Sequence, residues 1–220
     1  MYFLPRTHLC GVFYMKMDFD NEFWDSNYSE GKPGWDIGYI STPLKEYFDQ
    51  LTVKNIDILI PGAGNAYEAE YLFEKGFENV YIIDWSKKAA ESFLKRYQGF
   101  PKENIYIENF FEHKGKYDRV IEQTFFCAIH PSGRKRYAEK ANELLKPGGK
   151  LVGLLFNDKL FEDKPPYGGT KEEYATYFKP YFNFKVYETA HNSIKPRAGR
   201  ELFINFVKKD YSSDESGIIG

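Results

Sequence analysis

Two glycines followed by a carboxylate form the clearest chemical signal in the chain. Gly62 and Gly64 stand in the segment PGAGN, directly after an apolar run, and Asp84 ends the next apolar run about twenty residues later. Glycine lets the backbone turn sharply and approach a ligand where a side chain would collide. A carboxylate at that spacing can accept hydrogen bonds from both hydroxyls of a ribose. The pattern predicts a nucleoside-binding turn, and a purely structural turn between a strand and a helix is the alternative.

Residues beside this turn indicate which kind of nucleotide it could bind. A dinucleotide-binding fingerprint needs a third glycine three residues after Gly64, where this chain has Tyr67, and a Gly-Lys-Ser/Thr phosphate loop is absent from the sequence. Glu68, expected in the first turn of the following helix, is unfavourable beside a pyrophosphate. It is compatible with a ligand whose charges are an ammonium and a sulfonium. We therefore expect S-adenosylmethionine, rather than a nicotinamide dinucleotide, as the cofactor.

Alternating strand and helix patterns are expected to hold these residues in place. Short apolar runs predict strands at 56–61, 79–84, 104–109, 117–123, 150–157, 184–191 and 201–208. Apolar residues at helical spacing predict helices at 41–51, 66–75, 86–97, 131–145 and 171–180. This alternation is typical of a Rossmann-like α/β fold, with a mostly parallel seven-stranded sheet and helices on both faces. The last two strands are expected to pair as an antiparallel hairpin.

The chain length of 220 residues suits one domain. We expect it to span 18–210, with an aromatic, Gly-rich lid at 18–40. Residues 1–17 are interpreted as a disordered or misassigned N-terminal extension, and residues 211–220 as a flexible tail. The sequence shows neither an internal repeat nor a second domain.

Composition favours a small-molecule substrate. The 30 Lys and Arg residues nearly balance the 32 Asp and Glu residues, which does not suit a nucleic-acid partner. Cys10 and Cys127 are too few for a disulfide framework and lack metal-ligand spacing, so we expect a reduced, cytoplasmic setting without a bound metal. The sequence holds no apolar run long enough for a membrane helix. A monomer is the default expectation.

Several segments together resemble the thiopurine methyltransferase-like family, which includes plant thiol and halide methyltransferases. They are FWDSNYSEGKPGWDIG at 23–38, LIPGAGNAYEAEYL at 59–72, VYIIDWS at 80–86, YDRVIEQTFFCAIHPSGR at 117–134 and LLKPGGKLVGLLF at 144–156. The spacing Trp24–Tyr28–Trp35 ahead of the glycine turn is the specific part, since the other segments are shared by class I methyltransferases in general. The resemblance implies a class I methyltransferase that uses S-adenosylmethionine.

The same resemblance implies a set of cofactor-binding residues. They are Trp24, Tyr28, Trp35, Gly62, Gly64, Asp84, Asn109, Phe110 and Gln123. The three aromatic residues at its start would cover the methyl-transfer centre, Asp84 would bind the ribose, and Asn109 with Phe110 would flank the adenine. Departures from the family occur at Ala63, where cysteine is usual, at Asn109, where aspartate is usual, and at Gln123. The asparagine can still accept a hydrogen bond from the adenine amino group, whereas Gln123 leaves the acceptor preference open.

Methyl transfer from a sulfonium explains why no catalytic dyad is visible. The reaction is an in-line displacement, and orienting the nucleophile can contribute about 7–11 kcal/mol. A thiol that reacts as thiolate requires no strong base. We assign no certain catalytic residue and expect positioning by Trp35, Gln123 and Phe126. Phe126, Tyr167 and Arg197 are the candidate substrate-binding residues, Arg197 because its planar guanidinium could pair with a substrate carboxylate.

Other interpretations stay open at this point. Cys127 is more easily explained as buried packing than as a nucleophile, and His130 as a helix cap than as a base. The acceptor could be a thiol, a halide or a thiopurine. Two different classes of protein also compete: a nicotinamide-dependent oxidoreductase, which the residues after Gly64 disfavour, and a non-catalytic protein that binds S-adenosylmethionine.

Overall fold

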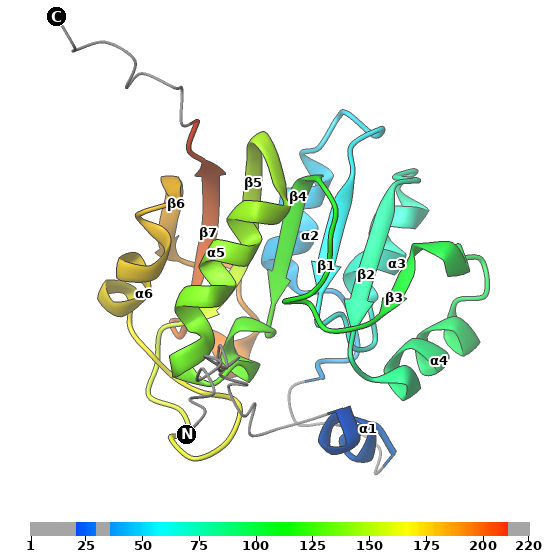
Figure 1. Ribbon diagram of the computed structural model, residues 1–220, viewed down its shortest axis with the longest axis horizontal. Helices are drawn as coiled ribbons and strands as arrows, with labels where there is room; N and C mark the ends of the chain where they lie inside the picture. The colour runs from blue at the N-terminus through cyan, green and yellow to red at the C-terminus, as the bar shows by residue number, and fades with distance from the viewer. Residues whose placement is uncertain (1–20, 30–35, 211–220) are drawn as a thin grey trace, which may run out of the picture.

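A seven-stranded sheet forms the centre of the molecule (Figure 1). The computed structural model describes residues 21–29 and 36–210. The strand order is β3-β2-β1-β4-β5-β7-β6. The strands are β1 (Ile58–Pro61), β2 (Val80–Asp84), β3 (Ile105–Ile107), β4 (Tyr117–Gln123), β5 (Leu145–Phe156), β6 (Phe182–Thr189) and β7 (Glu201–Lys208). Strands β1 to β5 run parallel, and β7 is antiparallel to both of its neighbours, β5 and β6.

Helices cover both faces of this sheet. They are α2 (Thr42–Asp49), α3 (Tyr67–Glu74), α4 (Lys87–Arg96), α5 (Arg134–Leu144) and α6 (Lys171–Phe178). Apolar side chains of α2, α3 and α4 form one core cluster with the sheet, and those of α5 and α6 form the other. A further helix, α1 (Asn21–Ser29), lies beyond the carboxyl edge of the sheet near α4 (Figure 1).

Strand β1 shows why the sheet forms where it does. All four of its residues are buried, as expected for a central parallel strand with a helix layer on each side. Leu59 belongs to one core cluster, and Ile58 and Ile60 belong to the other. Because successive side chains of a strand point to opposite faces of the sheet, this one short strand packs against both helix layers.

The predicted elements are confirmed, with boundaries that shift by up to five residues and one difference in strand direction. Strand β5 begins at Leu145 instead of residue 150, because Leu145 already pairs with Tyr117 of β4, and the regular pairing resumes at Lys150 after an irregularity in register. The helix expected from Pro131 starts as a short 3-10 turn, and α5 begins at Arg134. The terminal hairpin is present, but its edge strand β6 runs in the same direction as β1 to β5, so β7 is the reversed strand.

The predicted ends of the domain lie largely outside the described residues. This holds for the proposed extension at 1–17 and the proposed tail at 211–220. Within the proposed lid at 18–40, the structure describes α1 and residues 36–40. No helix within 21–29 and 36–210 combines the length and apolarity needed to cross a membrane.

Candidate active site

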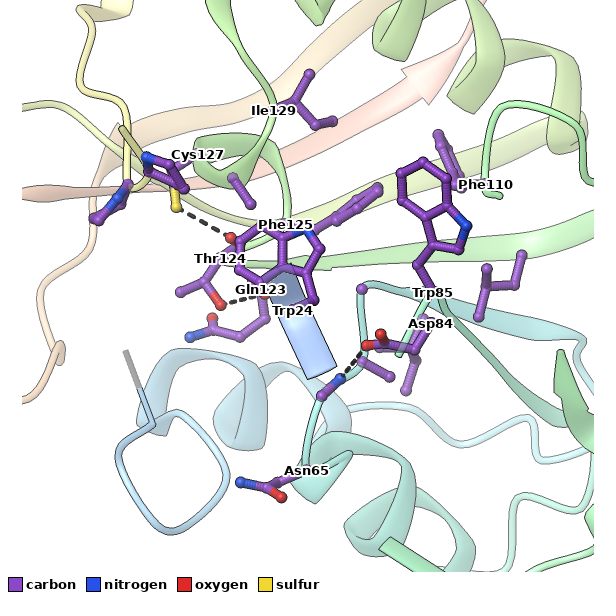
Figure 2. A pocket seen from close by; sticks show the side chains of 18 of the residues that line it. Trp24, Asn65, Asp84, Trp85, Phe110, Gln123, Thr124, Phe125, Cys127 and Ile129 are labelled. Carbon is purple, nitrogen blue, oxygen red and sulfur yellow. Dashed lines mark hydrogen bonds between the residues drawn. The ribbon is translucent and has the colours of Figure 1, made fainter. Parts of the chain in front are cut away.

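A cavity opens at the carboxyl edge of the sheet, where β1 lies between β2 and β4. This is the point at which the strand order reverses, and α/β folds bind ligands there. The loops that follow β1, β2, β3 and β4 all contribute to its wall (Figure 2). Side chains from these four loops include Asn65, Trp85, Asn109, Phe110, Gln123, Thr124, Phe125 and Cys127.

The glycine turn after β1 forms the floor of this cavity. Gly62 and Gly64 have φ angles of +58° and +55°, and Ala66 also lies in the left-handed region at 53°. A Cβ added at Gly62 would lie 2.3 Å from Cδ2 of Phe125, so the ring packs directly against the glycine backbone. Both the backbone conformation and the close approach therefore require glycine at this position.

Asp84 ties the end of β2 to this turn. Its Oδ2 accepts a hydrogen bond from the Gly64 amide at 2.7 Å, and its Oδ1 accepts one from the Ser86 amide at 2.8 Å. Burial raises the pKa of Asp84 above its ordinary value, while the two amides favour the charged form. A carboxylate oxygen can accept more than one hydrogen bond, so both oxygens can still accept from hydroxyls of a ligand in the cavity.

The loop after β3 closes one end of the cavity. Asn109 and Phe110, which the family resemblance places beside the adenine, both line it. The Asn109 Oδ1 accepts a hydrogen bond from the Phe111 amide at 3.0 Å, which fixes the start of the loop. The Phe110 ring is buried and meets the Phe125 ring edge-on at a centroid distance of 5.3 Å. These contacts give this end of the cavity an apolar wall with one amide at its rim.

Two acceptor side chains face the cavity from the adjoining elements. The Oε1 atom of Gln123, at the end of β4, is buried and has no hydrogen-bond partner among the described residues. Glu68 in the first turn of α3 is also buried, and its Oε1 accepts a hydrogen bond from the Ser41 amide at 3.2 Å. Burial raises the pKa of Glu68. An unpaired buried acceptor is costly, so this corner suits a ligand that carries a hydrogen-bond donor.

Helix α1 supplies one of the three predicted aromatic lid residues. Trp24 lines the cavity (Figure 2). The neighbouring Asp25 accepts a hydrogen bond from the Ser86 hydroxyl at 2.5 Å, which attaches α1 to the start of α4. Tyr28 belongs to α1, but its side chain lies outside the described residues, as does the whole of Trp35. Their expected cofactor contacts therefore stay predictions.

The three predicted substrate-binding residues are not among the residues that line this cavity, and their contacts with a substrate stay predictions. Phe126 points into the core, where its ring contacts Tyr137 and Phe178. Tyr167, which belongs to the loop after β5, is 1% exposed, and its ring meets the His130 ring edge-on at a centroid distance of 5.4 Å. Arg197 is 8% exposed and forms an ion pair with Glu201 at 3.3 Å. Sequence spacing could not reveal these orientations, because each depends on how a loop folds back onto the sheet.

The cavity wall includes aromatic residues that the sequence did not identify as part of the site. Trp85 and Phe125 line the cavity although neither was singled out from the sequence. A signal existed for Trp85, since it directly follows Asp84. For Phe125 the sequence offers two consecutive phenylalanines, and the structure shows that the first faces the cavity and the second the core.

Cys127 and His130 also reach the cavity wall. Burial raises the pKa of the Cys127 thiol to about 12, and its Sγ donates to the Thr124 carbonyl at 3.1 Å. Such a thiol stays protonated and is a poor nucleophile. The Nδ1 of His130 accepts a hydrogen bond from the Ser132 amide, consistent with a capping role. Among the described residues, no cluster of His, Cys, Asp or Glu could hold a metal ion.

The fold and the cavity together are typical of class I methyltransferases: a glycine turn, bonded to the Asp84 carboxylate, lies at the switch point of a sheet in which β7 is the antiparallel strand. Solved structures share this fold. The 1,6-didemethyltoxoflavin-N1-methyltransferase of Burkholderia thailandensis is 19% identical with a TM-score of 0.66, covering 86% of this chain and 87% of that chain. Magnesium protoporphyrin IX methyltransferase from Synechocystis PCC 6803 is 12% identical with a TM-score of 0.66, covering 86% and 95%.

The chain belongs to the Thiopurine S-methyltransferase (TPMT) family, whose sequence profile matches residues 19–210. "Probable thiol methyltransferase 2" of Arabidopsis thaliana is 29% identical over 185 residues, which cover 81% of each chain. Thiocyanate methyltransferase 1 of Brassica oleracea is 27% identical over the same share of both chains. The resemblance inferred from the sequence motifs is thereby confirmed, and the protein is a methyltransferase.

Proposed function

We propose that this methyltransferase transfers the methyl group of S-adenosylmethionine to the sulfur of a small thiol. The observation that carries the proposal is the cavity itself, in which the glycine turn after β1 and the Asp84 carboxylate lie beside a buried acceptor without a partner, Gln123 Oε1. Membership of a family whose relatives are named for thiol, thiocyanate and thiopurine methylation supports the sulfur acceptor.

The residues present fit S-adenosylmethionine. Asp84 would accept hydrogen bonds from the ribose hydroxyls, and Asn109 with Phe110 would hold the adenine. Gln123 Oε1 would gain a donor from the α-ammonium group, which removes the cost of an unpaired buried acceptor. The buried Glu68 carboxylate also lines the cavity, and a cationic ligand would stabilise its charged form. When bound, S-adenosylmethionine supplies a methyl group on a positively charged sulfur.

The chain contributes orientation and exclusion of water rather than acid–base chemistry. Trp24, Phe110 and Phe125 place aromatic rings around the cavity. Aromatic faces attract a desolvated cation by about 0.5–2 kcal/mol each. The same rings leave room for a soft, weakly hydrated nucleophile and offer little to a strongly hydrated one. A thiolate held here in line with the methyl group reacts without a catalytic base.

The part of the cavity wall formed by residues 124–128 and the loop after β5 has no charged side chain. Thr124, Phe125, Cys127 and Ala128 form it, together with Pro165 and Pro166 from the loop after β5. Such a surface favours a compact acceptor with an apolar body. A thiocyanate or halide ion is the second candidate acceptor, because it needs still less space and relatives bear the name thiocyanate methyltransferase. We further propose a monomeric protein in the cytoplasm that acts on a small molecule and not on nucleic acid, in keeping with the net charge of −2.

A methyl-transfer screen tests the acceptor. The purified chain would be given S-adenosylmethionine with aliphatic and aromatic thiols, thiopurines, thiocyanate and iodide in turn, and S-adenosylhomocysteine formation would be measured. We expect the highest kcat/KM for a thiol. Turnover confined to thiocyanate or iodide would replace the thiol proposal with the second candidate. Turnover of NADH with a carbonyl substrate, without any methyl transfer, would refute the proposed function altogether.

A further inference from the structure

A fully buried carboxylate lies behind the cavity wall and does not line the cavity. Glu122, the penultimate residue of β4, has 0% of its surface exposed. Its Oε1 accepts hydrogen bonds from the amides of Phe125 and Phe126, both at 2.8 Å. Its Oε2 accepts a hydrogen bond from the Tyr137 hydroxyl of α5 at 2.6 Å. Three donors from two elements thus converge on one side chain.

These bonds fix the loop at residues 124–128, which we call the acceptor loop. Its first residue, Thr124, has a φ angle of +61°, a conformation that non-glycine residues adopt only where the surroundings impose it. The Phe125 ring then lies against the Gly62 backbone, and Phe126 packs into the core on the other side. The Cys127 carbonyl accepts a hydrogen bond from the Tyr167 amide at 2.7 Å, which joins this loop to the one after β5.

We propose that Glu122 is a positioning residue for methyl transfer: it anchors the acceptor loop, so that the Phe125 ring keeps a fixed distance between the cofactor turn and the acceptor. This inference rests on the proposed function. The geometry supports this role. The carboxylate binds the amides of Phe125, whose ring faces the cavity, and of Phe126, whose ring faces the core. Loss of this anchor would let Phe125 leave Gly62 and widen the space in which the acceptor must be aligned.

The chemistry of the group explains why a carboxylate occupies this position. Each of its oxygens is an acceptor, whereas the amide of a glutamine has one acceptor oxygen and one donor nitrogen. A glutamine can satisfy both loop amides, but its nitrogen would then face the Tyr137 hydroxyl. Replacing Glu122 with glutamine therefore preserves the two hydrogen bonds to the loop amides and disturbs the one to Tyr137. Burial raises the pKa of Glu122 to about 7, while the three hydrogen-bond donors favour the charged carboxylate and act against that rise.

The experiment compares four variants of the full chain. Glu122→Ala removes the anchor, Glu122→Gln keeps the two loop amides paired, and Tyr137→Phe removes the third donor alone. Phe182→Leu is the control, because Phe182 is a buried core residue of β6 that does not line the cavity. For each variant we would measure the Kd for S-adenosylhomocysteine, the kcat and KM for the best thiol, the urea midpoint, and amide hydrogen exchange at Phe125 and Phe126.

A misplacement of about 1 Å can cost about a hundredfold in rate, so Glu122→Ala should approach that loss in kcat/KM for the acceptor. Glu122→Gln and Tyr137→Phe should show a smaller but measurable loss in kcat/KM, up to about tenfold, with the Kd for S-adenosylhomocysteine within about threefold of the original protein. Exchange at Phe125 and Phe126 should accelerate in the same order. Phe182→Leu should lower the urea midpoint and leave the acceptor kinetics unchanged.

Two results would overturn the inference. One is unchanged acceptor kinetics and exchange in both Glu122→Gln and Tyr137→Phe, which remain informative even where Glu122→Ala fails to fold. The other is a loss of S-adenosylhomocysteine affinity in parallel with acceptor kcat/KM, since that would indicate a general structural role. Absence of S-adenosylhomocysteine binding in the unaltered chain would instead refute the proposed function, while the exchange data would still report on the anchor.

Discussion

Gly62→Ala should destabilise the protein through two separable effects. An alanine at φ +58° adopts a left-handed conformation that costs about 1–2 kcal/mol. The new Cβ would also meet the Phe125 ring at 2.3 Å, and forced overpacking of this kind costs about 1–3 kcal/mol. We therefore expect the free energy of unfolding to fall by about 2–5 kcal/mol.

A second glycine separates these two contributions. Gly148 has a φ angle of +67°, but a Cβ added there has no heavy atom within 4 Å. Gly148→Ala should therefore cost only the conformational part, about 1–2 kcal/mol. Both substitutions reduce the entropy of the unfolded chain equally, so that effect cancels in the comparison. The difference between the two variants measures the collision with Phe125.

Urea unfolding, followed by tryptophan fluorescence and circular dichroism, is the assay. A double-mutant cycle with Phe125→Ala should give a coupling energy of about 1–3 kcal/mol, because removing the ring removes the collision. Equal losses of stability in Gly62→Ala and Gly148→Ala, together with zero coupling to Phe125, would refute the packing of the acceptor loop onto the glycine turn.

Three further predictions follow from the site. Asp84→Ala should weaken S-adenosylhomocysteine binding more than about tenfold by calorimetry, because it removes the acceptor for the ribose hydroxyls, and unchanged affinity would exclude this ribose site. Trp24→Ala should lower kcat/KM with the urea midpoint unchanged, and unaltered kinetics would make Trp24 a covering residue only. Burial raises the pKa of Glu122 from an ordinary 4.5 to about 7, so the folded state retains its proton more strongly than the unfolded state. Stability should therefore fall by about 3 kcal/mol in total as the pH rises from about 4.5 to about 7, and Glu122→Gln should lose this slope in urea titrations at successive pH values.

The sheet and its order of elements could be predicted from the sequence because their signals are local. Short apolar runs mark β1 and β2, and the periodic apolar residues of α2 and α4 face the core cluster that they share. Ser86 illustrates the point: its hydroxyl accepts a hydrogen bond from the Ala89 amide and caps α4, as serine before a helix commonly does. The cofactor turn is equally local, since Gly62 and Gly64 adopt the positive φ angles that their type suggests.

The acceptor wall could not be predicted in the same way, because its side chains are oriented by contacts between distant segments. Phe125 and Phe126 are adjacent and chemically identical, yet one faces the cavity and the other the core. What separates them is the Glu122 anchor and the strained conformation of Thr124. Arg197 carries a charge that suggested a substrate contact, but its ion pair with Glu201 places it in the interior.

Calorimetric titration of the purified chain with S-adenosylhomocysteine, followed in the same sample by addition of S-adenosylmethionine and a panel of thiols, tests the central claim most directly. We predict one binding site per chain with micromolar affinity and methyl transfer to at least one thiol, both weakened in Asp84→Ala. Absence of binding, or binding that Asp84→Ala leaves unchanged, would contradict the assignment of this cavity as the methyltransferase active site.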